Sequence, residues 1–231
     1  MSSENRTSVP NSLNEHWMPF TSNKDFKANP RLITEAKGVY LKTHHGKTQI
    51  DASSGLFCNP LGHGRKEITE AVTKQLDTLD YAQPFQQGFG GSFELASKIA
   101  KHTPGDLNKM FFTICGSTAV ETAIKIAVAY HRAKGNAQRF RFVGRERGYH
   151  GMNIGCVSVG GMVNNVKTFA SILMPGVQHI RHTHLPEHKF VSGQPETGDY
   201  LANDLETICQ NFGAENIAAC IVEPIAGSTG T

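Results

Sequence analysis

The spacing of apolar residues divides the chain into a short N-terminal part and a longer part in which strands and helices alternate. Apolar residues on either side of residues 44–47 predict a β-hairpin, because the turn between them contains Gly46. Apolar residues recur at helical spacing over 66–79, and a second helix is expected at 93–100. These elements indicate a small α+β part that extends to about residue 80.

From residue 109 onward the pattern is typical of an α/β domain. Four short, mostly apolar runs predict buried parallel strands: residues 109–114, 140–143, 177–180 and 217–222. Two segments have helical spacing: residues 119–131 and 201–212. Strands that alternate with helices imply right-handed crossovers and a mostly parallel sheet with helices on both faces. The sequence therefore predicts a doubly wound α/β domain after the small α+β part.

These patterns predict three segments along the chain. Residues 1–15 form a polar leader without the apolar core of a signal peptide, residues 16–80 form the small N-terminal segment, and residues 81–231 form the α/β domain. The sequence stops in a Gly/Ser loop directly after the run at 217–222, where a doubly wound sheet usually continues into another crossover. We therefore expect the chain to be truncated.

Composition narrows the range of functions. The 23 Lys and Arg against 20 Asp and Glu give a net charge of +3, which is too even a balance for a nucleic-acid-binding protein. No apolar run approaches the roughly 18 residues of a membrane span. The 5 cysteines are widely spaced and odd in number, which favours a reducing compartment over a disulfide framework. We expect a cytoplasmic protein that binds neither nucleic acid nor membranes.

Three loops lie where ligands collect in open α/β sheets, beyond the carboxyl ends of the strands. In the first, Gly116, Ser117 and Thr118 directly precede the helix predicted at 119–131, whose free N–H groups could hold a phosphate, or the turn could merely cap the helix. In the second, Tyr149 and His150 stand between two glycines. There the tyrosine could stack on a flat cofactor or simply cover the edge of the core.

The third loop begins at Glu223, directly after the last predicted strand. A carboxylate at a buried strand end needs partners, so Glu223 could order a site or cap a neighbouring loop. Four histidines also cluster in the sequence: His179, His182, His184 and His188. Their spacing imposes no common face and no zinc pattern is present, so a solvated loop is favoured over a metal site.

Six motifs occur in register along the chain: His16-Trp17-Met18-Pro19-Phe20-Thr21, Gly62-His63-Gly64-Arg65-Lys66-Glu67-Ile68, Leu79-Asp80-Tyr81, Cys115-Gly116-Ser117, Gly148-Tyr149-His150-Gly151 and Glu223-Pro224-Ile225-Ala226-Gly227-Ser228. Together they resemble the class III (ω-amino acid) aminotransferases, which are pyridoxal-phosphate-dependent enzymes of fold type I. Within this family the chain is most similar to the β-alanine/ω-amino acid–pyruvate aminotransferases. The resemblance covers the chain from about His16 to its end and represents the N-terminal half of such an enzyme.

The resemblance implies a cofactor, pyridoxal 5′-phosphate, and a set of residues that bind it: Gly116, Ser117, Thr118, Tyr149, His150 and Glu223. The first three would hold the phosphate at the helix N-terminus. The tyrosine would stack on the pyridine ring, the histidine would pack nearby, and the glutamate would order the network at the polar edge of the ring. The family usually has an acidic residue at the position of Thr118.

The resemblance also implies a substrate pocket and a homodimer. Trp17, Phe20 and Phe57 would line the pocket, and Phe85 would reach into it from the partner subunit. The family commonly has a tryptophan at the position of Phe57, so this chain would have a reshaped pocket.

The implied reaction moves an amino group from an ω-amino acid or amine, such as β-alanine, to pyruvate through Schiff bases, with the cofactor ring as electron sink. Family members supply the Schiff-base lysine beyond the position of Thr231. We therefore expect no catalytic residue in this chain and no activity from its 231 residues alone. Two alternatives remain: a non-catalytic fragment that needs a partner chain, and another fold type I reaction such as racemisation, decarboxylation or aminomutation.

Overall fold

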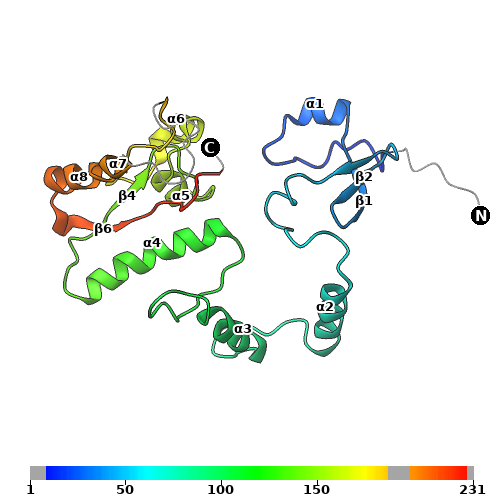
Figure 1. The fold of residues 1–231 in the computed structure, drawn as a ribbon, viewed down its shortest axis with the longest axis horizontal. Helices are drawn as coiled ribbons and strands as arrows, with labels where there is room; N and C mark the ends of the chain where they lie inside the picture. The colour runs from blue at the N-terminus through cyan, green and yellow to red at the C-terminus, as the bar shows by residue number, and fades with distance from the viewer. Residues whose placement is uncertain (1–8, 187–197, 228–231) are drawn as a thin grey trace, which may run out of the picture. The chain divides into compact units, whose positions relative to one another are not determined.

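The computed structural model describes residues 9–186 and 198–227 (Figure 1). The chain divides into two compact units, Met1–Lys98 and Ile99–Thr231, and each is described by itself. Residues 1–8 of the predicted leader lie outside the described part of the chain, and the predicted segment limits at 15 and 80 stay predictions. No helix within the described ranges is long and apolar enough to cross a membrane.

The first unit contains a three-stranded antiparallel sheet with the strand order β1-β2-β3. Its elements are α1 (Asn23–Ala28), β1 (Ile33–Lys37), β2 (Tyr40–Thr43), β3 (Thr48–Ile50), α2 (Lys66–Thr78) and α3 (Gly90–Ala100), which crosses the boundary between the units. The predicted hairpin is confirmed as β2 and β3, with Tyr40 opposite Ile50 and Gly46 at a φ of +77° in the turn. Both predicted helices are confirmed as α2 and α3, whereas α1 and β1 were not predicted.

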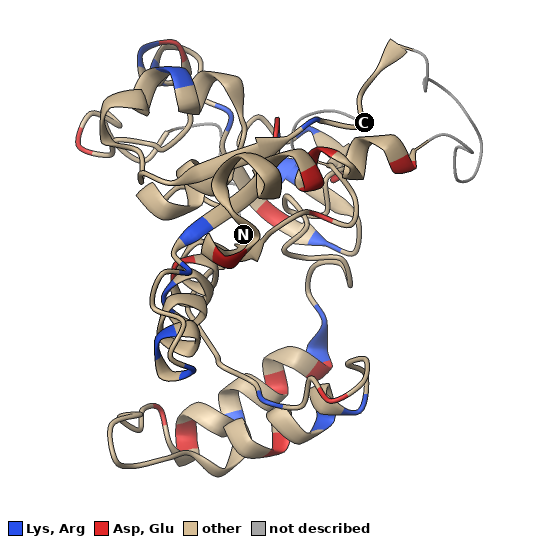
Figure 2. Cartoon of the chain, turned by 90° about the vertical axis from the view of Figure 1, so that its left-hand side faces the viewer, with Lys and Arg blue, Asp and Glu red and all other residues tan. Residues whose placement is uncertain are grey.

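Charged residues of both signs share the same helices rather than gathering by sign. Figure 2 shows Lys and Arg next to Asp and Glu along the helices, and α2 alone carries Lys66, Glu67, Glu70, Lys74 and Asp77. Pairs such as Lys42 and Glu35, at 3.3 Å, neutralise one another at the surface. The net charge is small, and positive and negative side chains are also mixed within single helices.

The second unit contains a parallel sheet with the strand order β5-β4-β6. Its elements are α4 (Gly116–Ala133), β4 (Arg141–Arg145), α5 (Ile154–Val159), α6 (Val163–Phe169), η1 (Ala170–Ile172), β5 (Val177–Ile180), α7 (Asp199–Ala202), α8 (Asp204–Phe212), η3 (Ala214–Asn216) and β6 (Ile217–Cys220). Helices connect each strand to the next, so the predicted parallel α/β fold is confirmed. The predicted helix at 201–212 is divided between α7 and α8.

The core of the second unit lies between β4 and the helices that contact it. Phe142 and Val143 of β4 are buried, and α5 packs on β4 and β5 with nearly all its residues buried. A Cβ at Gly144 would overlap the carbonyl oxygen of Val159, so the glycine allows α5 to lie directly on the strand. In Figure 1, α4 runs beside β6, where His131 Nε2 lies 3.0 Å from the Ala218 carbonyl oxygen.

One predicted strand is absent. Residues 109–114 form no strand in the described structure, although they are the first apolar run of the α/β pattern. Phe111 and Ile114 expose 70% and 93% of their surfaces. An apolar run indicates a tendency to be buried, but a strand forms only when a neighbour supplies hydrogen-bond partners. This segment has no such neighbour among the described residues.

Candidate active site

The N-terminus of α4 and the loop after β4 are packed against each other. Ser117 Oγ accepts a hydrogen bond from the Met152 N–H at 3.0 Å, and the Cys156 thiol donates to the Ser117 carbonyl oxygen at 3.2 Å. Gly151 has a φ of +122°, and a Cβ there would lie 2.5 Å from Ser117 Oγ. Glycine at position 151 therefore allows both the backbone conformation and the close approach of the two loops.

The first turn of α4 presents backbone N–H groups that have no helical acceptor. The first hydrogen bond of the helix runs from the Ala119 N–H to the Cys115 carbonyl oxygen at 3.0 Å, so the N–H groups of Gly116, Ser117 and Thr118 have no helical acceptor. No side chain of Cys115 caps the helix, and a Cβ at Gly116 would meet nothing within 4 Å. Open space in front of backbone donors that lack a helical acceptor, at the positive end of a helix dipole, suits an anion.

Both hydroxyls of this turn have partners in the chain, one in the loop after β4 and one at the residue that precedes α4. Ser117 Oγ faces Met152, as described above, and Thr118 Oγ1 lies 3.3 Å from Cys115 Sγ. Hydrogen bonds from the Thr118 hydroxyl and backbone lower the pKa of the Cys115 thiol. Neither hydroxyl acts as the N-cap of α4, because the N-cap position is Cys115 and both residues lie in the first turn of the helix.

Glu223 joins the ends of β4 and β6. Its Oε2 accepts a hydrogen bond from Arg145 Nη2 at 2.7 Å, and its Oε1 accepts one from the Tyr149 N–H at 2.7 Å. Both partners of the ion pair are largely buried, with 12% of the Arg145 side chain and 16% of the Glu223 side chain exposed. Burial alone would raise the pKa of Glu223, but these hydrogen bonds outweigh it and lower that pKa. Glu223 thus stays ionised and fixes the backbone of the Tyr149 loop.

Tyr149 and His150 lie on the loop that Glu223 fixes. The Tyr149 side chain is partly exposed, and His150 Nε2 is buried without a hydrogen-bond partner. Burial lowers the pKa of His150, the charge of Arg145 lowers it further, and that of Glu223 opposes the change. The ring is therefore uncharged at neutral pH. A buried ring nitrogen without a partner is uncommon and marks a place where an external group could bind.

The predicted substrate residues all belong to the first unit. Each exposes three quarters or more of its surface: Trp17 86%, Phe20 84%, Phe57 75% and Phe85 75%. Phe20 and Phe57 also have positive φ angles of 50° and 68°. Their grouping around a substrate stays a prediction.

The clustered histidines bond to different partners. His179 Nε2 donates to the Gly160 carbonyl oxygen at 2.6 Å, and His182 Nε2 lies 4.0 Å from Glu146 Oε2. His188 lies outside the described residues. Among the residues that the structure describes, no three potential metal ligands come together.

Two residues of this region were not predicted. Arg145 is the partner of Glu223, and Glu121 on α4 accepts a hydrogen bond from the Gly155 N–H at 2.7 Å, at the start of α5. An arginine at a strand end and a glutamate inside a helix carry no local signal of their partners. The pairing of Arg145 with Glu223 spans 78 residues and follows only from the parallel order of β4 and β6.

Comparison with known proteins decides the family. The family described as "Aminotransferase class-III" matches residues 21–231. The chain belongs to the class III aminotransferases. The predicted family is thereby confirmed.

Two bacterial relatives illustrate the similarity of this class III chain. It is 49% identical over 221 residues to an "Omega-aminotransferase" from Caulobacter vibrioides, covering 95% of this chain and 50% of the relative. It is 47% identical over 219 residues to a "Beta-alanine--pyruvate aminotransferase" from Pseudomonas aeruginosa, covering 94% and 48%. The chain spans about half the length of the curated relatives it matches.

Solved structures of transaminases share its fold. An omega transaminase from Pseudomonas jessenii in complex with PMP matches with a TM-score of 0.85 and 30% identity, covering 93% of this chain and 48% of that one. An (S)-enantioselective omega-transaminase from Thermomicrobium roseum matches equally, with a TM-score of 0.85 and 30% identity. The predicted fold type I architecture is therefore confirmed.

Proposed function

We propose that the protein to which these residues belong is a pyridoxal-phosphate-dependent aminotransferase that moves an amino group from an ω-amino acid or amine to pyruvate. The names of the two relatives at 47–49% identity support this choice of substrates. The observation that carries the proposal is the meeting of the α4 N-terminus, the Tyr149 loop and Glu223 in one unit. These are three of the motifs by which the sequence resembles the family.

The residues at the α4 N-terminus fit the phosphate of the cofactor. The backbone N–H groups of Gly116, Ser117 and Thr118 would donate to it, because they have no helical acceptor and open space lies in front of Gly116. The threonine in place of the usual acidic residue leaves these backbone donors unchanged and removes a negative charge from the neighbourhood of the phosphate.

The loop after β4 fits the ring of the cofactor. Tyr149 would stack on the ring, and the buried Nε2 of His150 would gain a partner that the chain itself does not provide. Glu223 would keep the loop in place through the Tyr149 N–H. When bound, the cofactor supplies an electron sink for amine chemistry, while these residues orient it.

The substrate pocket and the subunit arrangement are also part of the proposal. Trp17, Phe20 and Phe57 would line the donor site, and Phe85 of a second subunit would complete it in a homodimer. The high exposure of all four side chains supports contacts beyond the single chain. We place the enzyme in the cytoplasm, in keeping with its widely spaced, free cysteines.

Replacing Gly151 by alanine tests the cofactor site. Gly151→Ala in the full-length protein should weaken pyridoxal 5′-phosphate binding about tenfold, because the new Cβ would separate the Tyr149 loop from Ser117. Equilibrium dialysis measures this loss independently of turnover. Gly135→Ala is the matched control, since Gly135 also has a positive φ, of +80°, but a Cβ there would meet nothing within 4 Å. Equal affinities for the two variants would contradict the proposed site.

Product analysis separates the proposal from its alternatives. The full-length protein, supplied with β-alanine and pyruvate, should form L- or D-alanine in equal amounts to the donor consumed. Carbon dioxide release, racemisation of added L-alanine, or alanine formed from β-alanine without consumption of pyruvate would instead indicate another fold type I reaction. Whether residues 1–231 transfer amino groups by themselves stays a prediction, and the same assay on that polypeptide tests it.

A further inference from the structure

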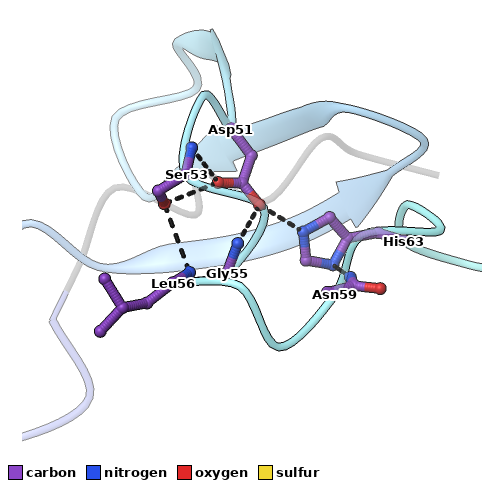
Figure 3. A network of polar contacts seen from close by, with 6 residues as sticks. All are labelled: Asp51, Ser53, Gly55, Leu56, Asn59 and His63. Carbon is purple, nitrogen blue, oxygen red and sulfur yellow. Dashed lines mark hydrogen bonds and ion pairs between the residues drawn. The ribbon is translucent and has the colours of Figure 1, made fainter. Parts of the chain in front are cut away.

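A buried carboxylate organises the loop that follows β3 in the first unit (Figure 3). Asp51 Oδ1 accepts hydrogen bonds from the Ser53 N–H and hydroxyl at 3.2 and 3.0 Å. Its Oδ2 accepts from the Gly55 N–H at 2.8 Å and pairs with His63 Nε2 at 3.0 Å. Only 6% of the Asp51 side chain is exposed. Four donors occupy the hydrogen-bonding capacity of an ionised carboxylate.

Both ring nitrogens of His63 are engaged. An ionised carboxylate can only accept, so Nε2 carries the proton and donates to Asp51. In the neutral ring Nδ1 is then the acceptor, and it lies 2.8 Å from Asn59 Nδ2. Because both nitrogens are engaged, His63 acts as a fixed support for the carboxylate.

The turn between β1 and β2 anchors both ends of this network. The Asp51 N–H donates to the Val39 carbonyl oxygen at 2.8 Å, and His63 exchanges two backbone hydrogen bonds with Gly38, at 2.8 and 2.9 Å. A Cβ at Gly62 would lie 3.1 Å from the Gly38 carbonyl oxygen, so the approach of the two segments is close. The carboxylate and the imidazole are thus held against the same turn of the sheet.

The residues between these anchors adopt an unusual conformation. Four consecutive residues have positive φ angles: Ser54 51°, Gly55 61°, Leu56 55° and Phe57 68°. The Phe57 N–H donates to the Ser53 carbonyl oxygen at 2.9 Å, which closes a left-handed turn. Each residue other than glycine is strained in this region, so such a turn persists only where its surroundings impose it. The hydrogen bonds of Asp51 to Ser53 and Gly55 are in position to do so.

Within the described residues, the strained turn lies outside the packed core. Leu56 exposes 73% and Phe57 exposes 75% of its surface. Strain without burial indicates that the turn has another purpose, namely the placement of the side chains that it presents. Phe57 is the residue that the proposed function assigns to the donor pocket.

We propose that Asp51 is a positioning residue that holds the left-handed turn of residues 54–57, fixes the Phe57 ring and thereby sets which amino donors the enzyme accepts. This inference rests on the proposed aminotransferase function. A fixed ring excludes donors with a bulky group next to the amine and leaves small ω-amino acids unaffected. A mobile ring would lose this discrimination, while the chemistry at the cofactor would continue.

Asp51→Asn in the full-length protein tests the inference. The asparagine NH2 group would face either the Gly55 N–H and the His63 Nε2–H or, in the other orientation, the Ser53 N–H, with a donor in place of an acceptor, so the turn should loosen. The ratio of kcat/KM for β-alanine to that for 1-phenylethylamine should fall about tenfold, carried by KM rather than by kcat. Amide hydrogen exchange in residues 53–59 should accelerate. Asp77→Asn, the same change at an exposed position on α2, is the matched control and should alter neither quantity.

A second substitution separates positioning from general destabilisation. Leu56→Asn introduces a residue that tolerates positive φ, so Asp51→Asn combined with Leu56→Asn should recover part of the donor ratio. If Asp51→Asn does not fold, Ser53→Ala removes one donor to Asp51 and should shift the ratio and the exchange in the same direction by less. An unchanged ratio and unchanged exchange in Ser53→Ala would then overturn the inference.

The outcomes distinguish the inference from the proposed function. A wild-type protein that transfers no amino group from either donor overturns the proposed function. An active wild type whose Asp51→Asn variant matches Asp77→Asn in donor ratio and in local exchange overturns only the role of Asp51. Faster exchange in residues 53–59 with an unchanged ratio also overturns it, because the turn would then be held without affecting donor choice.

Discussion

Asp51 and Glu223 work in the same way at the scale of single residues. Each is a mostly buried carboxylate that accepts hydrogen bonds from backbone N–H groups and from one basic side chain, His63 or Arg145. In each, these bonds lower the pKa of the carboxyl group, to about 2 for Asp51. Each fixes a loop that bears an aromatic side chain, Phe57 or Tyr149. Carboxylates therefore order both loops that we assign to the active site.

The lowered pKa of Asp51 predicts how stability depends on pH. Its pKa falls from 3.8 to about 2 on folding, chiefly through His63, so the contribution of Asp51 to stability is complete above about pH 4 and is lost as pH falls toward 2. The free energy of unfolding of the wild type should exceed that of Asp51→Asn at pH 6, and the difference should shrink steadily below pH 4. Urea unfolding at pH 6 and at a pH below 4 measures this difference in the free energy of unfolding. A difference that is independent of pH would contradict this assignment.

The sequence predicted a site role for Glu223 but not for Asp51. Glu223 was predicted because it follows an apolar strand in an α/β pattern, where ligands collect. Asp51 follows a short hairpin, and only the serine two residues later hints at a turn. Its partner His63 is 12 residues away, and the left-handed turn depends on both. Local patterns reveal where a chain turns, but they do not reveal contacts across a loop.

At the scale of elements, apolar patterns predicted segments well where the partner was also in the chain. The strands β4, β5 and β6 were predicted from their apolar runs, and they form because these runs pair with one another. The similar run at 109–114 is not a strand, since no described neighbour takes its hydrogen bonds. The helix α5 was missed because it is short, mostly apolar and buried on nearly all sides, which removes the helical alternation of polar and apolar positions. The helix α6 was also missed, and it has only 7 residues.

The contact between β4 and α5 depends on one glycine. Gly144→Ala should lower the free energy of unfolding by about 3 kcal/mol, because the new methyl group would overlap the Val159 carbonyl oxygen and force α5 away from the strand. Chemical denaturation measures the change. Gly90→Ala on α3 is the control, since a Cβ there would meet nothing within 4 Å, and it should be neutral or slightly stabilising. A neutral Gly144→Ala would show that α5 can shift without cost.

At the scale of the whole molecule, both units present large apolar side chains to solvent. On α2, Ile68, Val72 and Leu76 are each at least half exposed, and Phe111 and Ile114 are more so. Exposed apolar side chains in such number favour association with other protein surfaces. The chain also spans about half the length of its curated relatives.

These surfaces predict the behaviour of the isolated polypeptide. Residues 1–231, expressed by themselves, should bind the dye ANS and sediment at multiples of 25.2 kDa, because exposed apolar faces associate with one another. Replacing both Phe111 and Ile114 by serine should reduce dye binding without loss of helical circular dichroism. A monomer that binds no dye would mean that these side chains are covered within the chain in solution.

The backbone hydrogen bonds that anchor Asp51 and His63 to the turn between β1 and β2 also limit how the loop 51–63 can change in length. Surface loops usually accept inserted or deleted residues with little consequence. Here the Val39 and Gly38 carbonyl oxygens fix both ends of the loop, at Asp51 and His63, and one residue more or less would displace Phe57 from its turn. Libraries that aim at new amine substrates should therefore vary the identity of residue 57 freely and keep the length of the segment 51–63 constant.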